Sequence, residues 1–200
     1  MDKQTTMRIT SDEFHALPLR ANALLHDVPL EDAWAVPLSG GGVGRTIQDF
    51  LAVMVVGREE APALVKGLFQ LRNRIGGLFG WDHKRPEWLA ESYADRLSAA
   101  DRAQSLVASG TPDGNFSLLY QFEAEQLGEL RNATVHAFSS LSIQPMPGGY
   151  VVYLGVFVQP VHRFTKPYMA AIAPFRRLVV YPAVIQKVQS AWVKRYGSER

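Results

Sequence analysis

The sequence predicts an α+β domain in which a curved antiparallel sheet packs against a long C-terminal helix. Three observations support this class. Apolar residues recur at helical spacing between residues 46 and 80, they alternate with a period of two from residue 116, and they return to helical spacing after residue 163. Helices and strands are therefore grouped along the chain, which is typical of α+β proteins.

Composition limits the class of protein. A chain of 200 residues that is 47% hydrophobic and 20% charged predicts one domain over residues 1–200. Because 21 basic and 19 acidic residues are spread along the chain, we expect no nucleic-acid partner. The absence of cysteine excludes disulfides, thiolate chemistry and zinc sites that use sulfur.

Two further patterns concern location. The start, "MDKQTTMRITSDEF", lacks the apolar core of a signal peptide, and the longest apolar stretch, residues 168–185, is interrupted by Arg176 and Arg177. We therefore expect a cytoplasmic protein without integral membrane association. Residues 1–28 carry no clear pattern.

The first strand and its glycine-rich loop resemble the start of a nucleotide-binding motif. "DAWAVPL", residues 32–38, predicts a short strand, and "SGGGVGRT", residues 39–46, follows it. Gly44 and Thr46 fit a P-loop, but Ser39 replaces its first glycine and Arg45 its lysine. We expect a connecting loop whose glycines supply positive φ angles and which could form one lip of a cavity.

Two helices are expected next. The first covers residues 46–57, where Thr46 and Asp49 can cap the first turn, and the second runs from Pro62 to Gly80. Residues 83–115 predict helical turns at most, ending in the loop "SGTPDGN". Two helices therefore follow the first strand.

Three strands with short turns complete the predicted sheet. Alternation predicts a half-buried strand over residues 116–125, with "EQLGE" at 125–129 as its turn. Residues 130–143 and 150–161 are rich in β-branched and aromatic residues and predict two more strands. Together they form an antiparallel meander.

The C-terminal segment, residues 161–196, predicts a long amphipathic helix. Its apolar stripe is interrupted by Pro174 and Pro182, which each remove a backbone donor. We expect a helix that is kinked or broken at both places.

The chain resembles a known family over two segments. "HRFTKPYMAAIAPFRRLVVYPAV" at 162–184 and "LVKGLFQLRNRIGGLFG" at 64–80, with the "TVHAF" strand, are similar to a bacterial family known as domain of unknown function 2867. The element order is also similar to the helix-grip fold of the START and Bet v 1-like (SRPBCC) superfamily. That resemblance implies a cavity between a curved sheet and the last helix.

Few residues are candidates for catalysis, ligand binding or metal binding. His136 shares a strand face with Phe138 and could act as a general base or hold a ligand's polar head, although a buried imidazole bonded to the backbone or to Tyr120 or Tyr153 is the alternative. Glu123, Glu125 and Glu129 are expected on a solvated outer face. The histidines have no metal-binding spacing, so we expect neither a metal site nor a cofactor.

The leading hypothesis is a binding protein for a small hydrophobic or lipid-like ligand, with the cavity that the fold resemblance implies. The alternatives are a cyclase- or dehydratase-like enzyme that uses His136 as acid or base with Tyr153 or Tyr120 orienting a carbonyl, and an accessory domain with a filled core. Exposed apolar residues on the last helix could support a homodimer. The predicted wall residues are Phe50, Met54, Phe122, His136, Phe138, Tyr153, Phe157, Met169, Ile172 and Phe175.

Overall fold

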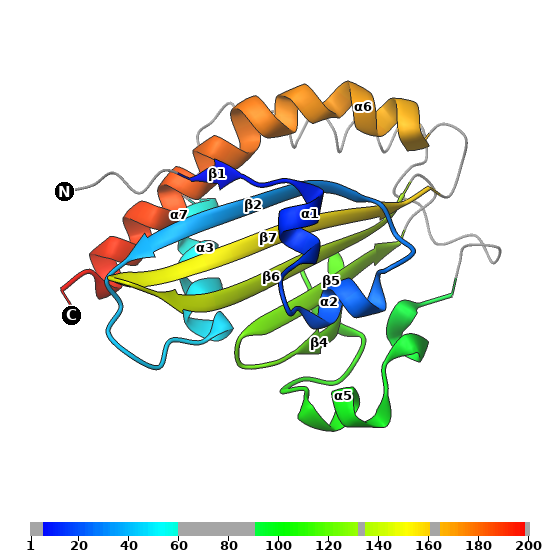
Figure 1. The fold of residues 1–200 in the computed structure, drawn as a ribbon, viewed down its shortest axis with the longest axis horizontal. Helices are drawn as coiled ribbons and strands as arrows, with labels where there is room; N and C mark the ends of the chain where they lie inside the picture. Colours follow the sequence, from blue (N-terminus) through cyan, green and yellow to red (C-terminus); the bar gives the residue numbers. More distant parts are fainter. Residues whose placement is uncertain (1–5, 60–90, 132–134, 161–164, 199–200) are drawn as a thin grey trace.

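A seven-stranded antiparallel sheet forms the centre of the computed structural model, which describes residues 6–59, 91–131, 135–160 and 165–198. The strand order is β1-β2-β7-β6-β5-β4-β3, so the first long strand pairs with the last one (Figure 1). The sheet is curved, and its centre is an antiparallel meander of four strands, one more than the three expected. The strands are β1 (Met7–Arg8), β2 (Leu30–Ser39), β3 (Thr111–Asp113), β4 (Phe116–Gln121), β5 (Glu125–Arg131), β6 (His136–Met146) and β7 (Gly149–Gln159).

The long helices cover one face of the sheet, which we call the long-helix face. Strand residues of this face, such as Trp34, Val152 and Ile143, pack against α3 and α7 in one apolar cluster. Met169 of α6 packs against the same face further along the strands. The helices of this face are α3 (Ile47–Glu59), α6 (Thr165–Phe175), the π-helical segment η2 (Arg176–Val180) and α7 (Tyr181–Tyr196).

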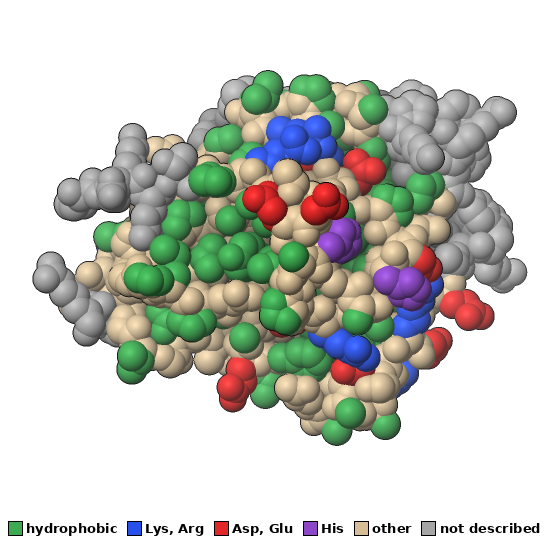
Figure 2. All heavy atoms as spheres, in the orientation of Figure 1, with side chains coloured by type: hydrophobic (Ala, Val, Ile, Leu, Met, Phe, Trp, Pro, Cys, Tyr) green, Lys and Arg blue, Asp and Glu red, His purple; other side chains and the backbone are tan. Residues whose placement is uncertain are grey.

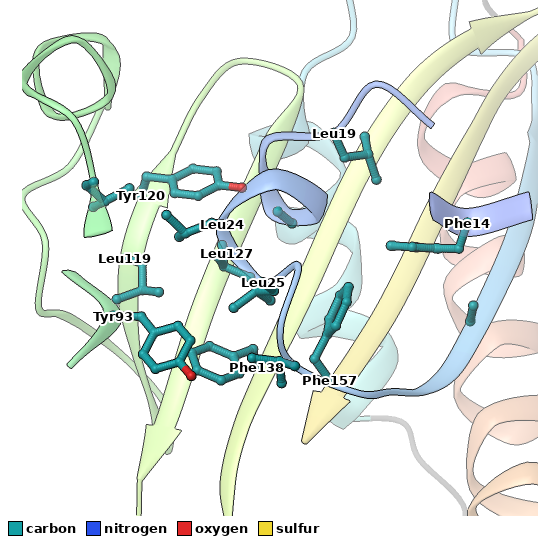
Figure 3. Packing of buried hydrophobic residues seen from close by; sticks show 14 residues of the cluster. Phe14, Leu19, Leu24, Leu25, Tyr93, Leu119, Tyr120, Leu127, Phe138 and Phe157 are labelled. Atoms are coloured by element: carbon teal, nitrogen blue, oxygen red, sulfur yellow. The ribbon is translucent and has the colours of Figure 1, made fainter. Parts of the chain in front are cut away.

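Short helices cover the opposite face, which we call the short-helix face. Their side chains join Phe138 and Phe157 of the sheet in a second apolar cluster (Figure 3). Residues 6–28, which carry no clear sequence pattern, thus form ordered structure against the sheet. The elements are α1 (Ser11–His15), α2 (Arg20–Leu24), the 3₁₀ helix η1 (Tyr93–Arg96) and α5 (Ala99–Gln104).

The C-terminal helix departs from α-helical geometry between its two prolines. Pro174 lies inside α6 and Pro182 in the first turn of α7, and the five residues between the two α-helices form a π-helical turn. Neither proline has a backbone N–H to donate, so the α-helical ladder is interrupted on both sides of the segment. Instead of a kink or break at each proline, the structure has one π-helical segment between them, and helix continues without a gap from α6 to α7.

The glycine loop has the expected conformation. Gly40, Gly41, Gly42 and Gly44 all have positive φ angles. A Cβ atom on Gly41 would lie 2.9 Å from Cζ2 of Trp192, so this position is restricted by packing as well as by its φ of 106°. The loop therefore closes against the end of α7.

One predicted turn is wrong. Residues 125–129, "EQLGE", form most of β5, and the chain turns at residues 122–124 instead, where the Phe122 N–H donates to the carbonyl of Glu125. Strand β4 accordingly ends at Gln121. The charges of Glu125 and Glu129 led to the prediction of an exposed turn. Both side chains are buried, and each accepts a hydrogen bond from another element. The predicted helix at 62–80 lies outside the described residues.

Candidate functional site

The predicted wall residues lie on both faces of the sheet. Phe50 and Met54 of α3, and Met169 and Ile172 of α6, pack on the long-helix face, and Phe175 is half-buried at the end of α6. The others pack on the short-helix face. Because the sheet separates these two groups, they cannot line one cavity, and only the first group lies on the side of the C-terminal helix. The short-helix group consists of Phe122, His136, Phe138, Tyr153 and Phe157.

Large rings fill the part of the long-helix face under α7. Trp192 is fully buried and contacts Tyr150 and Tyr196 edge to face, with ring centroids 6.0 and 4.8 Å apart. Ile185 and Val188 are buried beside them. This part of the interface between sheet and C-terminal helix is therefore occupied by the protein's own side chains.

The part under α6 is built differently. Its side chains are aliphatic and mostly small, and three of them are only partly buried. Among the residues that the structure describes, this cluster contains no aromatic ring, and we call it the α6 patch. It consists of Val135, Ala137, Val158 and Met169 with the half-buried Leu130, Val156 and Ile172.

A charged cluster lies at the edge of the α6 patch, at the start of β2. Asp32 is almost fully buried and pairs in register with Val156 of the patch. Arg177 Nε donates to Asp32 Oδ1 at 2.6 Å, and Arg176 Nη2 lies 2.8 Å from Asp32 Oδ2. The hydroxyl of Tyr181 is close by, and burial followed by the Asp32 carboxylate raises the pKa of Tyr181. The π-helical segment thus directs two consecutive arginines toward one carboxylate.

A second polar cluster lies on the short-helix face around Glu129. Glu129 Oε1 lies 2.8 Å from His136 Nε2, and both side chains are buried. The carboxylate also accepts hydrogen bonds from Ser92 Oγ at 2.6 Å and from the Tyr93 N–H at 2.9 Å. Burial tends to raise the pKa of Glu129, but the bonds from His136, Ser92 and Tyr93 outweigh it, so the pKa is lowered.

A third polar cluster forms around Glu125, on the same face. Glu125 accepts the N–H groups of Arg20 and Ala21, at 2.9 and 2.8 Å, and the hydroxyl of Tyr120. Leu19, the N-cap residue of α2, makes no side-chain capping bond, so Glu125 caps this helix from the sheet. Burial, and then the adjacent carboxylate, raise the pKa of Tyr120 well above its ordinary value.

Sequence reasoning missed these two acids. Glu125 and Glu129 were expected on a solvated face, yet they are 8% and 2% exposed. One signal was present: residues four apart in a strand share a face, and Leu127 lies between these two on that face. An apolar residue between two acids indicates that the face is covered.

The predicted catalytic partners are not brought together. His136 and Phe138 do share a face, as the alternation predicts, but Tyr93 covers His136 with ring centroids 5.1 Å apart. Figure 3 shows the Tyr93 ring beside that of Phe138. His136 pairs in register with Gln159 and Tyr153 with Ser142, so six residues of strand, or roughly 20 Å, separate the two side chains. The imidazole is therefore within hydrogen-bond distance of Glu129 but not of Tyr153.

The described residues contain neither a metal-binding cluster nor a membrane-spanning helix. Among the residues that the structure describes, no three His, Asp or Glu side chains gather where they could hold a metal ion. Within the same residues, every helix is too short or too polar to cross a membrane.

Fold and contacts together define an α+β protein with one curved antiparallel sheet and a C-terminal helix across one face. Residues 24–183 match the family described as protein of unknown function (DUF2867). The chain belongs to this family. Comparisons with curated proteins and with solved structures found no match.

Proposed function

We propose that this protein binds a small hydrophobic molecule between the sheet and α6. The observation that supports this proposal is the difference between the two halves of the long-helix face. Under α7 the space is occupied by Trp and Tyr rings, whereas under α6 the side chains are aliphatic and Leu130, Val156 and Ile172 remain half-buried. Incompletely buried apolar surface beside a helix favours an apolar ligand.

The sheet order supports membership of the helix-grip superfamily as a further part of this proposal. The strand before the first long helix lies beside the last strand of the meander, and the C-terminal helix crosses the same sheet. In this fold the ligand space lies between sheet and last helix. The proposed site is therefore the half of that face which carries aliphatic, partly buried side chains instead of large rings.

A matched pair of variants on α6 tests the proposal. Ile172 packs on the patch, whereas the adjacent Ala171 is exposed. Ile172→Trp should fill the site and weaken binding of the uncharged dye Nile red about 10-fold or more, while Ala171→Trp should leave the affinity unchanged. Fluorescence titration measures both. Equal affinities for the two variants and the wild type would exclude this location.

Native mass spectrometry of the freshly purified protein provides an independent test. A bound small molecule that can be extracted with solvent, and that is lost from Ile172→Trp, would support the site and identify the natural ligand class. A bare mass together with no binding of Nile red would favour the accessory domain with a filled core. The aromatic and aliphatic side chains packed under α7 already support a filled core in that half of the long-helix face.

An acid–base function for His136 is the second candidate, and the buried Glu129–His136 pair favours it. A carboxylate that bonds one imidazole nitrogen can orient the ring for proton transfer at the other nitrogen. The other nitrogen, Nδ1, is buried and has no hydrogen-bond partner among the residues that the structure describes. An enzyme of this kind should show turnover with a pH profile that disappears in His136→Ala. A binding protein should show no turnover in either form.

We also propose that the protein is cytoplasmic and that it forms a homodimer. Leu178 and Val193 on the C-terminal helix are 77% and 51% exposed, which supports a contact between two chains. Light scattering of the purified protein tests the dimer. A monomer at all concentrations would exclude it.

A further inference from the structure

The cluster at the start of β2 holds two guanidinium groups and one carboxylate. Arg177 makes two hydrogen bonds: its Nε donates to Asp32 at 2.6 Å, and its Nη2 donates to the carbonyl of Glu31 at 2.9 Å. Arg176 only approaches the second oxygen of the same carboxylate. One positive charge in this cluster is therefore not neutralised by Asp32.

The excess charge lies on Arg176. Its Nε and Nη2 atoms are buried and make no hydrogen bond of good geometry to any described residue, although Nη2 is in ionic contact with Asp32. Within the described part of the chain, the acceptor of its third nitrogen, Nη1, is the Met169 sulfur at 3.7 Å. Buried guanidinium donors without acceptors are costly, so this side chain is suited to an additional anionic partner.

Arg176 also lies beside the α6 patch. Met169 belongs to the patch, and the contact between its sulfur and Arg176 places the guanidinium at the patch's edge. Asp32 pairs in register with Val156, another patch residue, so the cluster adjoins the patch from the sheet side too. Figure 2, which views the short-helix face, shows basic side chains between α6 and the edge of the sheet, beside acidic ones.

We propose that Arg176 binds the head group of a long-chain carboxylate whose alkyl chain lies along the α6 patch. This inference rests on the proposed function and adds the chemical class of the ligand. A monoanion matches one excess positive charge, and a carboxylate can accept the Nε and Nη2 hydrogens of one guanidinium together. A single alkyl chain suits a patch of small aliphatic side chains.

The test compares decanoate with decan-1-ol, which have the same chain length and differ in head-group charge. Each ligand displaces Nile red from the wild type at a pH where decanoate is ionised. We expect decanoate to bind about 10-fold to 100-fold more tightly, as one charge-assisted pair of hydrogen bonds predicts. In Arg176→Gln this preference should disappear, because Asp32 and Arg177 then form a balanced pair.

Two controls keep the result specific. Lys194→Gln removes the same charge from an exposed position on α7 and should keep the preference. Arg176→Lys retains the charge without the paired donors and should keep only part of it. If Arg176→Gln does not fold, a preference in the wild type that is reduced in Arg176→Lys supports the role of Arg176, and an unreduced one contradicts it.

The outcomes separate this inference from the proposed function. Equal affinities for decanoate and decan-1-ol, or an unchanged preference in folded Arg176→Gln, would overturn the role of Arg176 and leave hydrophobic binding intact. If Nile red itself does not bind, the proposed function fails and this inference fails with it.

Discussion

Glu125 and Glu129 lie four residues apart on the same face of β5, and each accepts backbone N–H groups from the first turn of a different helix. Glu125 bonds the N–H groups of Arg20 and Ala21 at the start of α2, and Glu129 bonds that of Tyr93 at the start of η1. Two buried carboxylates of the sheet thus stabilise the N-termini of helices that cover it. Their role in the described structure is to attach the short-helix face.

Removing the first carboxylate should loosen α2. Glu125→Ala leaves the N–H groups of Arg20 and Ala21 and the Tyr120 hydroxyl without an acceptor, which should lower the free energy of unfolding by about 1–3 kcal/mol. Urea denaturation measures this change. Hydrogen exchange should accelerate at Arg20 and Ala21. Glu123→Ala, at an exposed position next to the same strand, is the control and should change little.

The second carboxylate should make stability depend on acid. The pKa of Glu129 in the folded protein is below its ordinary value of 4.5, so the carboxylate stabilises the fold above that pH. This contribution is lost as the pH falls through the lower folded pKa. Glu129→Gln has no such titration, so its stability should fall less between about pH 6 and about pH 3. Parallel acid-side slopes for variant and wild type would contradict this.

Gly155 leaves room for the Phe14 ring of α1. A Cβ atom at this position would overlap the ring, and Phe14 is fully buried and cannot move away freely. Gly155→Ala should therefore lower the unfolding free energy by about 1–3 kcal/mol. In the background of Phe14→Leu the same change should cost much less, which a double-mutant cycle by urea denaturation would reveal. Additive effects would show that the two positions do not interact.

Trp192 should be the main attachment of α7. It is fully buried between the sheet, the glycine loop and Tyr196. Trp192→Ala should lower the unfolding free energy by about 3–5 kcal/mol, because the residual cavity adds to the lost burial. Val193→Ala, at the adjacent and half-exposed position, should change it by less than about 0.5 kcal/mol. Thermal melting of both variants tests the contrast.

Local patterns in the sequence determined the class of fold and many element positions. The change from helical spacing to alternation at Phe116, the glycines after Ser39 and the prolines in the last helix each act through their own backbone and near neighbours. For this reason the meander, the loop conformation and the interrupted helix could be predicted. The strand at 125–131 could not, because its glutamates have partners about 100 and 36 residues away in sequence.

Only the tertiary structure decided which residues share a space. Alternation places His136 and Phe138 on one face of a strand but cannot say which helix covers that face, and it is η1 rather than α6 that does so. Likewise, no local pattern pairs Asp32 with Arg176 and Arg177, because Asp32 and Arg177 are 145 residues apart in sequence. Periodicity assigns a side chain to a face of its own element, whereas charge pairing and the contents of a buried space depend on contacts between distant segments.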